Sequence, residues 1–278
     1  MTALEPSPPA GATALTVDLN ADLAEGYGAW TFGCDDDLLS LVTSANVACG
    51  FHGGDPSTIR RAVETAVARG VVIGAHVGYP DLQGFGRRNM DIGHQELVDL
   101  TVYQLAALDG VTRVAGSRVR YVKPHGALYN RVARDAAQAE AVAEAVASFD
   151  NELRVLSLPG SALHRAAHAR GLDTLDEVFG DRAYLASGAL APRSTEGSVI
   201  HDPDQVAKRV LQMVRHHTVN TLDDTTLDVV PDSVCIHGDS PGAVQLAAAV
   251  RHRLEEAGVS VRSPLAPAQP DRRPDAPR

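Results

Sequence analysis

Short apolar runs alternate along this chain with longer amphipathic segments, and the two patterns predict different elements. The apolar runs are rich in β-branched residues and are bounded by glycine, which is typical of buried strands. They predict strands at 16–22, 44–49, 71–76, 119–124, 153–158, 175–179 and 233–237. The intervening segments repeat apolar residues at helical spacing. They predict helices at 35–42, 56–69, 94–115, 135–148, 161–170, 203–217 and 241–257.

Capping residues support several of these helix boundaries. Asp55 followed by Pro56 is a favourable helix start, because the carboxylate can accept from free amides and proline needs no amide partner. Gly70, Gly171 and Gly258 each follow a predicted helix. Glycine at that position often ends a helix in the left-handed conformation.

The regular alternation of strand and helix predicts an α/β fold with a parallel sheet. Such units can close into a barrel or form an open, doubly wound sheet. We favour a seven-stranded parallel β/α barrel, because side chains suited to a site follow at least five strands and a ring brings them to one centre. We expect one domain at 14–264, with a small excursion or hairpin at 219–230. The Pro-rich segments 1–13 and 265–278 are predicted to be disordered tails.

Composition excludes several classes of protein. The formal net charge is -10, which disfavours nucleic acid and acidic membranes as partners. No apolar run approaches the length of a membrane span. The Pro- and Ala-rich N-terminal segment has no basic start and no apolar core, so we do not expect a signal peptide. The three cysteines contain no C-x-x-C pair, and a reduced, cytoplasmic setting fits them best.

Four histidines follow four of the predicted strands. His52, His76, His125 and His237 each come where an apolar run stops, and each is followed within two residues by glycine. A lone histidine at a strand end is more often structural than catalytic. Four together favour an active site, because chemistry collects at the carboxyl ends of parallel strands. We therefore expect the four side chains to face one mouth of the barrel.

The first predicted strand carries three polar residues on one side. Asp18, Asn20 and Asp22 alternate with apolar residues, and Glu25 follows shortly after. Buried polar side chains need partners, so this row favours a function. It could bind a metal through Asp18 and Asp22, act as a general base, or bind a ligand. The alternatives are a solvated strand end or acids that cap helices.

Lys123 stands out because the chain has only one other lysine, Lys208. It lies in an otherwise apolar strand, directly before Pro124 and His125. The lysine could hold a phosphate or a developing oxyanion, and His125 could act as acid or base. The alternative is a lysine that reaches solvent beside a capping histidine.

Arginines are the candidates for binding an anionic ligand. Arg87 and Arg88 lie in a long loop that contains three glycines, and such loops are usually functional. They could grip a carboxylate or phosphate, or they could simply be solvated. Arg182 and Arg193 are expected to add to the same rim. The sequence contains no P-loop and no dinucleotide-binding glycine motif after the first strand, so a nucleotide would bind by less familiar means.

Together these segments resemble the LamB/YcsF family. The matching stretches are 18–26, 44–56, 74–88, 123–130, 177–184, 192–193 and 234–241. They run in order through most of the chain, from about residue 16 to 260. The departures are small: the family usually has glycine where this chain has Ala24, alanine where it has Gly53, and proline where it has Val77.

The resemblance implies a seven-stranded β/α barrel related to deacetylase-like barrels. It also implies the family's characterised role as the A subunit of the bacterial ATP-dependent 5-oxoprolinase, which cleaves 5-oxo-L-proline to L-glutamate with B and C subunits. ATP, bound as Mg-ATP with Mg²⁺, is then the expected cofactor, and the resemblance does not fix a protein-bound metal. Two other functions remain open: an ATP-independent, metal-dependent amide hydrolase or deacetylase, and a ligand-binding subunit without catalysis.

The chemistry of lactam opening gives the candidate residues their roles. A five-membered lactam is a stable amide, and phosphorylation of its oxygen by ATP makes it a better electrophile for water. This requires a cation near the phosphate, for which Lys123 is the candidate, with an arginine or a magnesium ion held by Asp18 or Asp22. His52 or His125 could be the base for water. The expected catalytic residues are Asp22, His52, Lys123 and His125. The expected binding residues are Asn20, Glu25, Asn46, His76, Arg87, Arg88, Arg182, Arg193 and His237.

Overall fold

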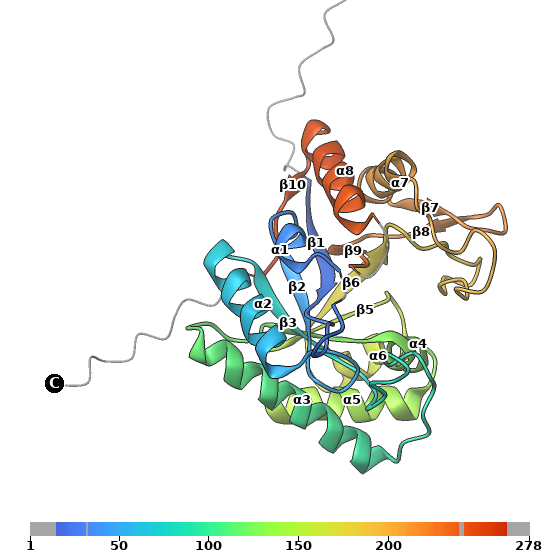
Figure 1. The fold of residues 1–278 in the computed structure, drawn as a ribbon. Helices are drawn as coiled ribbons and strands as arrows, with labels where there is room; N and C mark the ends of the chain where they lie inside the picture. Colours follow the sequence, from blue (N-terminus) through green and yellow to red (C-terminus); the bar gives the residue numbers. More distant parts are fainter. Residues whose placement is uncertain (1–14, 32, 239–241, 266–278) are drawn as a thin grey trace, which may run out of the picture.

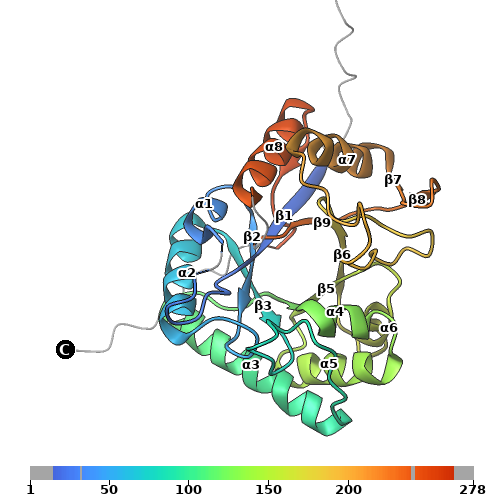
Figure 2. The same cartoon turned by 45° about the vertical axis from the view of Figure 1, so that its right-hand side comes forward.

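A closed barrel of parallel strands forms the centre of the molecule (Figures 1 and 2). The computed structural model describes residues 15–31, 33–238 and 242–265. Strand β1 pairs with both β2 and β9, which closes the ring in the order β1-β2-β3-β4-β5-β6-β9. This confirms the expected seven-stranded barrel. The barrel strands are β1 Thr16–Leu23, β2 Ser44–Ala48, β3 Val72–Val77, β4 Tyr121–Pro124, β5 Arg154–Ser157, β6 Thr174–Phe179 and β9 Ser233–Ile236.

Helices cover the outside of the ring, as Figure 2 shows in a view close to the barrel axis. Their bounds are α1 Asp35–Leu38, α2 Pro56–Arg69, α3 His94–Val114, α4 Gly126–Val132, α5 Ala136–Phe149, α6 Ala162–Ala169, α7 Pro203–His216 and α8 Ala243–Glu256. The predicted helix at 35–42 is shorter than expected, and α4 was not predicted. Helix α4 begins directly after β4, so the last strand residues and the first helical turn follow each other without a loop.

Three short strands complete the described part of the chain. Strands β7 (Thr218–Asn220) and β8 (Thr226–Asp228) pair antiparallel, which confirms the expected hairpin. Strand β10 (Ser260–Val261) pairs with β1 outside the ring and was not predicted. Apart from Leu265, the predicted tails lie outside the described residues. Among the described helices, none is long and apolar enough to cross a membrane.

The caps proposed from sequence set the ends of α2. The Asp55 side chain accepts from the amides of Ser57 and Thr58, and Gly70 ends the helix with φ 68°. The apolar residues of the strands pack against the helices, while the barrel interior is polar where β1 contributes Asp18, Asn20 and Asp22. A polar interior is unusual for a barrel of this kind, whose lumen is ordinarily filled by branched apolar side chains.

Candidate active site

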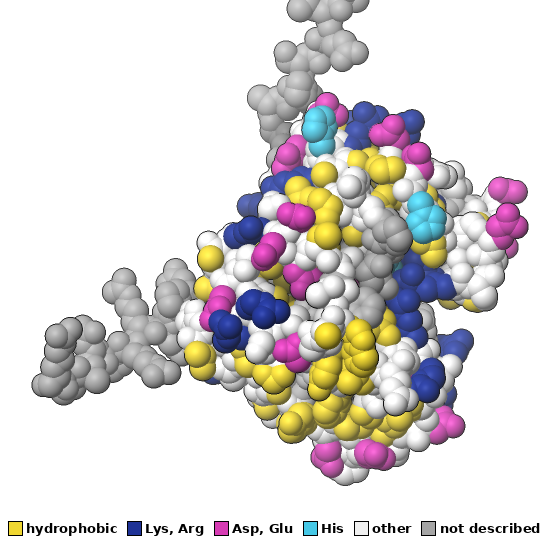
Figure 3. Space-filling model, viewed as in Figure 1, with side chains coloured by type: hydrophobic (Ala, Val, Ile, Leu, Met, Phe, Trp, Pro, Cys, Tyr) yellow, Lys and Arg dark blue, Asp and Glu magenta, His cyan; other side chains and the backbone are white. Residues whose placement is uncertain are grey.

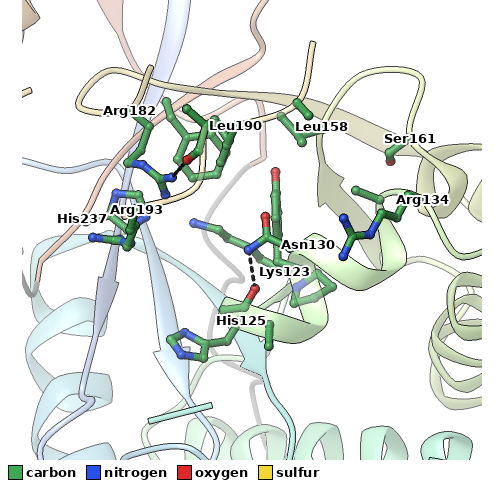
Figure 4. Close-up of a pocket in the computed structure, with 18 of the residues that line it drawn as sticks. Lys123, His125, Asn130, Arg134, Leu158, Ser161, Arg182, Leu190, Arg193 and His237 are labelled. Atoms are coloured by element: carbon green, nitrogen blue, oxygen red, sulfur yellow. Dashed lines mark hydrogen bonds between the residues drawn. The ribbon is translucent and has the colours of Figure 1, made fainter. Parts of the chain in front are cut away.

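A cavity of about 730 Å³ opens at the carboxyl ends of the strands. Figure 4 shows Lys123 near its centre, His125 below it, Arg182, Arg193 and His237 on one side, and Arg134 on the other. In Figure 3, Lys and Arg side chains gather beside a hollow at the right of the molecule, between the part that contains α7 and the part that contains α4. The cavity is therefore bordered by cations and has acids and histidines at its base.

Lys123 lies at the base of the cavity, held by acidic groups. Its Nζ atom is 2.8 Å from Asp22 Oδ1, 2.9 Å from Glu177 Oε1 and 3.1 Å from Cys235 Sγ. Burial by itself would lower the pKa of the lysine, but Asp22, Cys235 and Glu177 raise it well above the usual value. Lys123 therefore remains an ammonium, and it keeps two carboxylates at the bottom of the cavity.

Three of the predicted histidines form one cluster around Glu25. His52 Nε2 and His125 Nδ1 each lie 3.2 Å from Glu25 Oε1, and His76 Nε2 lies 3.8 Å from the same oxygen. The rings of His52 and His125 stack with centroids 3.7 Å apart. A Cβ at Gly86 would lie 2.6 Å from His125 Cδ2, so the glycine lets the loop after β3 pack directly on this ring. Each of the four residues is buried, and together they could hold a metal ion.

Burial and neighbouring side chains determine the charges of Glu25 and His52 in this cluster. Burial would raise the pKa of Glu25, but the neighbouring His125 and His52 lower it. Burial lowers the pKa of His52 to about 3, and His125 adds to this effect. His52 is thus neutral at physiological pH. It does not line the cavity, because it lies behind His125.

His237 follows β9, lines the same cavity and has its own carboxylate partner. Its Nδ1 atom lies 2.9 Å from Asp181 Oδ2, and the ring stacks on Phe179. Burial would raise the pKa of Asp181, but His237 lowers it, so the carboxylate is charged. A charged carboxylate accepts only, so Nδ1 is the donor and Nε2 is left as an acceptor. This is the arrangement of a histidine base with an orienting acid.

Of the four arginines proposed from sequence, three line the cavity and one does not. Arg87, Arg134, Arg182 and Arg193 line the cavity, whereas Arg88 donates to Asp81 on the loop after β3. Arg182 is only 6% exposed and donates to the carbonyls of Ala191 and Ser198.

Arg182 lacks the acid that a buried cation usually has. Within the described residues, no carboxylate forms an ion pair with its guanidinium. Burial lowers its pKa to about 10, and the neighbouring cations Arg193 and Arg87 contribute. Asp181 acts in the opposite direction but forms no ion pair with Arg182, so this buried cation beside two other cations favours an anionic ligand.

Asp18, Asn20 and Asn46 lie deeper in the barrel than the cavity. Asp18 accepts from the hydroxyls of Thr43, Ser44 and Ser233, and burial raises its pKa. Asn46 donates to both Asn20 Oδ1 and Asp22 Oδ1. The structure therefore separates Asp18 from the histidine cluster, and only Asp22 of this row lines the cavity. Asn20 and Asn46 support Asp22 from below.

Several residues that line the cavity or contact its lining residues were not singled out from sequence. Glu177 and Asp181 contribute the partners of Lys123 and His237, and Arg134 adds a cation from the end of α4. The acids at 177 and 181 do carry a signal, since they flank the end of a predicted strand. That signal was weaker than a histidine at a strand end, because charged residues are common at such positions.

Comparisons with known proteins identify relatives of this chain. The sequence profile of the LamB/YcsF family matches residues 17–269. The chain is 53% identical over 248 residues to the 5-oxoprolinase A subunit of Mycolicibacterium gilvum, covering 89% of this chain and 98% of that protein. It is 50% identical over 246 residues to the 5-oxoprolinase A subunit of Acinetobacter baumannii, covering 88% and 97% respectively.

A solved crystal structure also matches this chain in sequence and in fold. The crystal structure of the lactam utilization protein from Thermus thermophilus matches with a TM-score of 0.86 and 48% sequence identity, covering 90% of this chain and 100% of that one. The match in sequence and in fold extends over nearly the whole described chain, including every strand of the ring. The chain belongs to the LamB/YcsF family.

Proposed function

We propose that this chain is the lactam-binding subunit of an ATP-dependent 5-oxoprolinase, which hydrolyses 5-oxo-L-proline to L-glutamate and couples this to hydrolysis of ATP to ADP and phosphate. The observation that carries the proposal is Arg182, a buried cation without a carboxylate partner among the described residues, in a cavity that also contains an acid-oriented histidine. The names of its relatives, which refer to 5-oxoprolinase and to lactam utilization, support the same substrate class.

The arginines give the substrate its orientation. 5-Oxoproline is a small ring with one carboxylate, and guanidinium groups bind carboxylates through two parallel hydrogen bonds. Arg182 and Arg193 lie on the same side of the cavity as His237 (Figure 4). A carboxylate bound by these arginines would place the lactam ring toward the base of the cavity, where Asp22, Lys123 and His125 lie.

His237 is the best-placed base for the hydrolytic water. Its Nδ1 donates to Asp181, which leaves Nε2 to accept a proton as water attacks the lactam carbon. His52, which the sequence also suggested, does not reach the cavity, and His125 has both ring nitrogens within hydrogen-bond distance of protein atoms. We therefore assign His237 the catalytic role that the sequence gave to one of those two.

ATP would make the lactam reactive. Transfer of its γ-phosphoryl group to the lactam oxygen gives a carbon that water attacks more readily. Addition of water, loss of phosphate and cleavage of the C–N bond, with a proton delivered to nitrogen, then yield glutamate. Lys123 supplies a positive charge at the base of the cavity, where negative charge would develop.

The nucleotide needs more than this chain offers. The sequence has no glycine-rich phosphate loop that would cradle the phosphates of a nucleotide. We infer that Mg-ATP binds at a site completed by the B and C subunits. The names of the relatives designate each of them as one subunit of the enzyme, which supports the existence of such partners.

Reconstitution tests this proposal. Glutamate and ADP are measured with 5-oxoproline and Mg-ATP, first with the purified chain and then with its B and C partners added. The chain alone should form little glutamate, and the full set should form glutamate and ADP in equal amounts. Full turnover by the chain alone would refute the shared nucleotide site. No turnover with all three subunits would overturn the substrate assignment.

An ATP-independent amide hydrolase is the second candidate, because the cluster of three histidines and Glu25 could hold a metal. The same assay without ATP, with and without a chelator, separates the two. Glutamate formed without ATP and abolished by the chelator would favour this candidate. Titration of 5-oxoproline into the chain alone also tests whether it binds the lactam without turning it over.

A further inference from the structure

The four residues Glu25, His52, His76 and His125 come from four successive strands and direct one atom each to a common point. Glu25 and His52 follow β1 and β2, His76 lies in β3, and His125 follows β4. Their ligand atoms all lie within 4.8 Å of one another, and the shortest separations from Glu25 Oε1 are 3.2 Å. We propose that these four side chains bind a divalent transition-metal ion of the zinc class in the wall of the cavity.

The hydrogen bonds behind two of the rings determine where their protons lie. His76 Nδ1 is 3.0 Å from the carbonyl of Lys123, and His125 Nε2 is 2.8 Å from the carbonyl of Phe85. A carbonyl oxygen only accepts, so both of these ring nitrogens carry the hydrogen. In neutral rings the other nitrogens, His76 Nε2 and His125 Nδ1, are then bare.

These two bare nitrogens face each other at 3.0 Å. Two lone pairs cannot form a hydrogen bond, so the contact is repulsive unless a cation lies between them or one ring takes up a second proton. Metal-binding histidines usually donate their remaining N–H to a backbone carbonyl or a carboxylate. His76 and His125 both have that partner, which favours a metal ion over a proton.

The distances match a tetrahedral ion. Zinc binds imidazole nitrogen at about 2.0–2.1 Å, so two ligand atoms of a tetrahedral site lie roughly 3.3 Å apart. The three separations from Glu25 and the one between His76 and His125 range from 3.0 Å for His76 with His125 to 3.8 Å for His76 with Glu25, and all four ligand atoms lie within 4.8 Å of one another. His52 completes the set with Nε2 at 3.2 Å from Glu25, and its buried Nδ1 has no partner among the described residues.

The charge of the surroundings also favours a divalent cation. Asp22 and Glu25 bring two carboxyl groups to the cavity end of the barrel, and the Lys123 ammonium pairs with Asp22 and with the deeper Glu177. Asp22 Oδ2 is 3.3 Å from His76 Nε2, so a second carboxylate faces the cluster directly. Three imidazoles and one carboxylate suit zinc and its neighbours better than magnesium, which prefers oxygen ligands.

This site differs from the carboxylate site that the sequence suggested. Asp18 lies among hydroxyls deep in the barrel, and Asp22 faces Lys123 with one oxygen. Glu25, His76 and His125 line the cavity, so the ion would lie at its surface and be reachable by a ligand. The inference does not depend on the proposed substrate, because metal binding is measurable without turnover.

Metal content and affinity test the proposal directly. The full chain is stripped with a chelator, reloaded by equilibrium dialysis against zinc, and measured by elemental analysis, with unfolding temperature as a second readout. We expect one zinc per chain, no displacement by excess magnesium, and a higher unfolding temperature with zinc. Glu25→Gln and His76→Ala should each weaken zinc binding at least about tenfold, since even supporting residues of metal sites cost that much.

The control is His252→Ala, which removes an exposed histidine that pairs with Glu256 far from the cluster. It should bind zinc as the parent does. Circular dichroism of the metal-free variants shows whether they fold. If His76→Ala does not fold, Glu25→Gln still tests the proposal, because glutamine is close in shape to glutamate. The proposal is overturned if the parent shows no saturable zinc binding, or if Glu25→Gln and His76→Ala bind as tightly as His252→Ala. Zinc binding by a chain that cannot open 5-oxoproline with its partners would keep this inference and refute the proposed function.

Discussion

The Lys123 ammonium lies 2.8 Å from Asp22 Oδ1, and both side chains are buried at the base of the cavity. Glu177 on β6 contacts the same ammonium, so one cation joins β1, β4 and β6 across the barrel interior. Buried charges are costly without partners, and removing one member of such a group leaves the others unpaired. Burial would raise the pKa of Asp22, but His76 and then Lys123 lower it well below its usual value, so the lysine helps to keep this acid charged.

Lys123→Arg should therefore not behave as a conservative change. The planar guanidinium is larger than the ammonium and cannot occupy the narrow space between Asp22, Glu177 and Cys235 in the same way. We expect a loss of roughly 2–4 kcal/mol of transition-state stabilisation, as for removal of other electrostatic donors. The measurement is kcat/KM of the reconstituted complex. Activity within a few-fold of the parent would show that Lys123 has no part in the reaction.

Arg182→Lys should weaken substrate binding more than it slows the chemical step. A lysine retains the charge but loses the two-pronged contact with a carboxylate. A hydrogen bond to a charged group contributes about 1.5–3 kcal/mol, so KM should rise roughly 10- to 100-fold.

Arg88→Lys is the matched control for this change, because Arg88 lies one residue from a cavity arginine yet pairs with Asp81 outside the cavity. Its KM should equal that of the parent. Equal KM values for Arg182→Lys and Arg88→Lys would exclude Arg182 as the carboxylate ligand.

Asp181→Asn should lower kcat with little effect on substrate affinity. The asparagine amide can donate to His237 Nδ1, which forces the proton onto Nε2 and removes the base. General base catalysis contributes about 10²–10⁴-fold, and we expect a loss in that range.

The double variant distinguishes this role from a structural one. If Asp181 acts through His237, then Asp181→Asn with His237→Asn should be no slower than His237→Asn alone, because residues that act as a unit are not additive. Additive losses would show that the two side chains act separately.

Gly53→Ala should displace Glu25, because a Cβ at this position would lie 2.6 Å from the Glu25 carbonyl oxygen. We expect a loss of about 1–3 kcal/mol in the free energy of unfolding, typical of overpacking. Ala24, next to Glu25, has φ 58°, a conformation that glycine adopts at no steric cost. A glycine at position 24 would let the backbone beside Glu25 move away from a Cβ at position 53.

Ala24→Gly should therefore reduce the cost of Gly53→Ala when the two changes are combined. Chemical denaturation of the parent, both single variants and the double variant gives the coupling energy, which we expect to exceed about 0.5 kcal/mol. Gly110→Ala is the control, because a Cβ at this helical position would meet no atom within 4 Å. It should stabilise α3 by about 0.5–1 kcal/mol. A coupling energy near zero would show that the two positions are independent.

Sequence patterns predicted the barrel well because most of its strands are short apolar runs that alternate with longer amphipathic helices. The histidines were visible for the same reason, since each follows a strand and the ring brings strand ends together. Depth within the barrel was harder to predict. Asp18 and Asp22 share one side of β1, but at about 3.3 Å per residue they lie about 13 Å apart, so only Asp22 reaches the cavity.

The conformation of the loops was the second feature that could not be predicted from the sequence. Arg87 and Arg88 are adjacent, yet Arg87 lines the cavity and Arg88 turns to Asp81. Nothing in the local pattern distinguishes the two, because the path of the loop after β3 depends on contacts with His52 and His125. Glu177 was missed for a related reason: its role exists only once β6 closes on Lys123 from β4.

Asp35→Asn should stabilise the protein at neutral pH and have no effect in acid. Asp35 accepts from the amide of Ala24, and burial raises its pKa to about 6, with the carboxylates of Glu25 and Asp36 contributing. This folded-state pKa lies above the unfolded value of 3.8, so the folded protein binds the proton more tightly. The free energy of unfolding therefore falls as the pH rises from 3.8 to about 6.

Asparagine removes this dependence and can still accept from the Ala24 amide. The gain in the free energy of unfolding should be absent at the acid end of this pH range. Above the upper end of the range it should reach roughly 1–2 kcal/mol, which is less than the full pKa shift implies because Asp35 is partly exposed. Denaturation is measured across this pH range on chelator-treated protein, so that no bound metal ion offsets the charge of Glu25. Asp37→Asn, on the exposed side of α1, is the control and should show no such pH-dependent gain. A gain for Asp35→Asn of equal size at every pH would show that the titration of Asp35 does not affect stability.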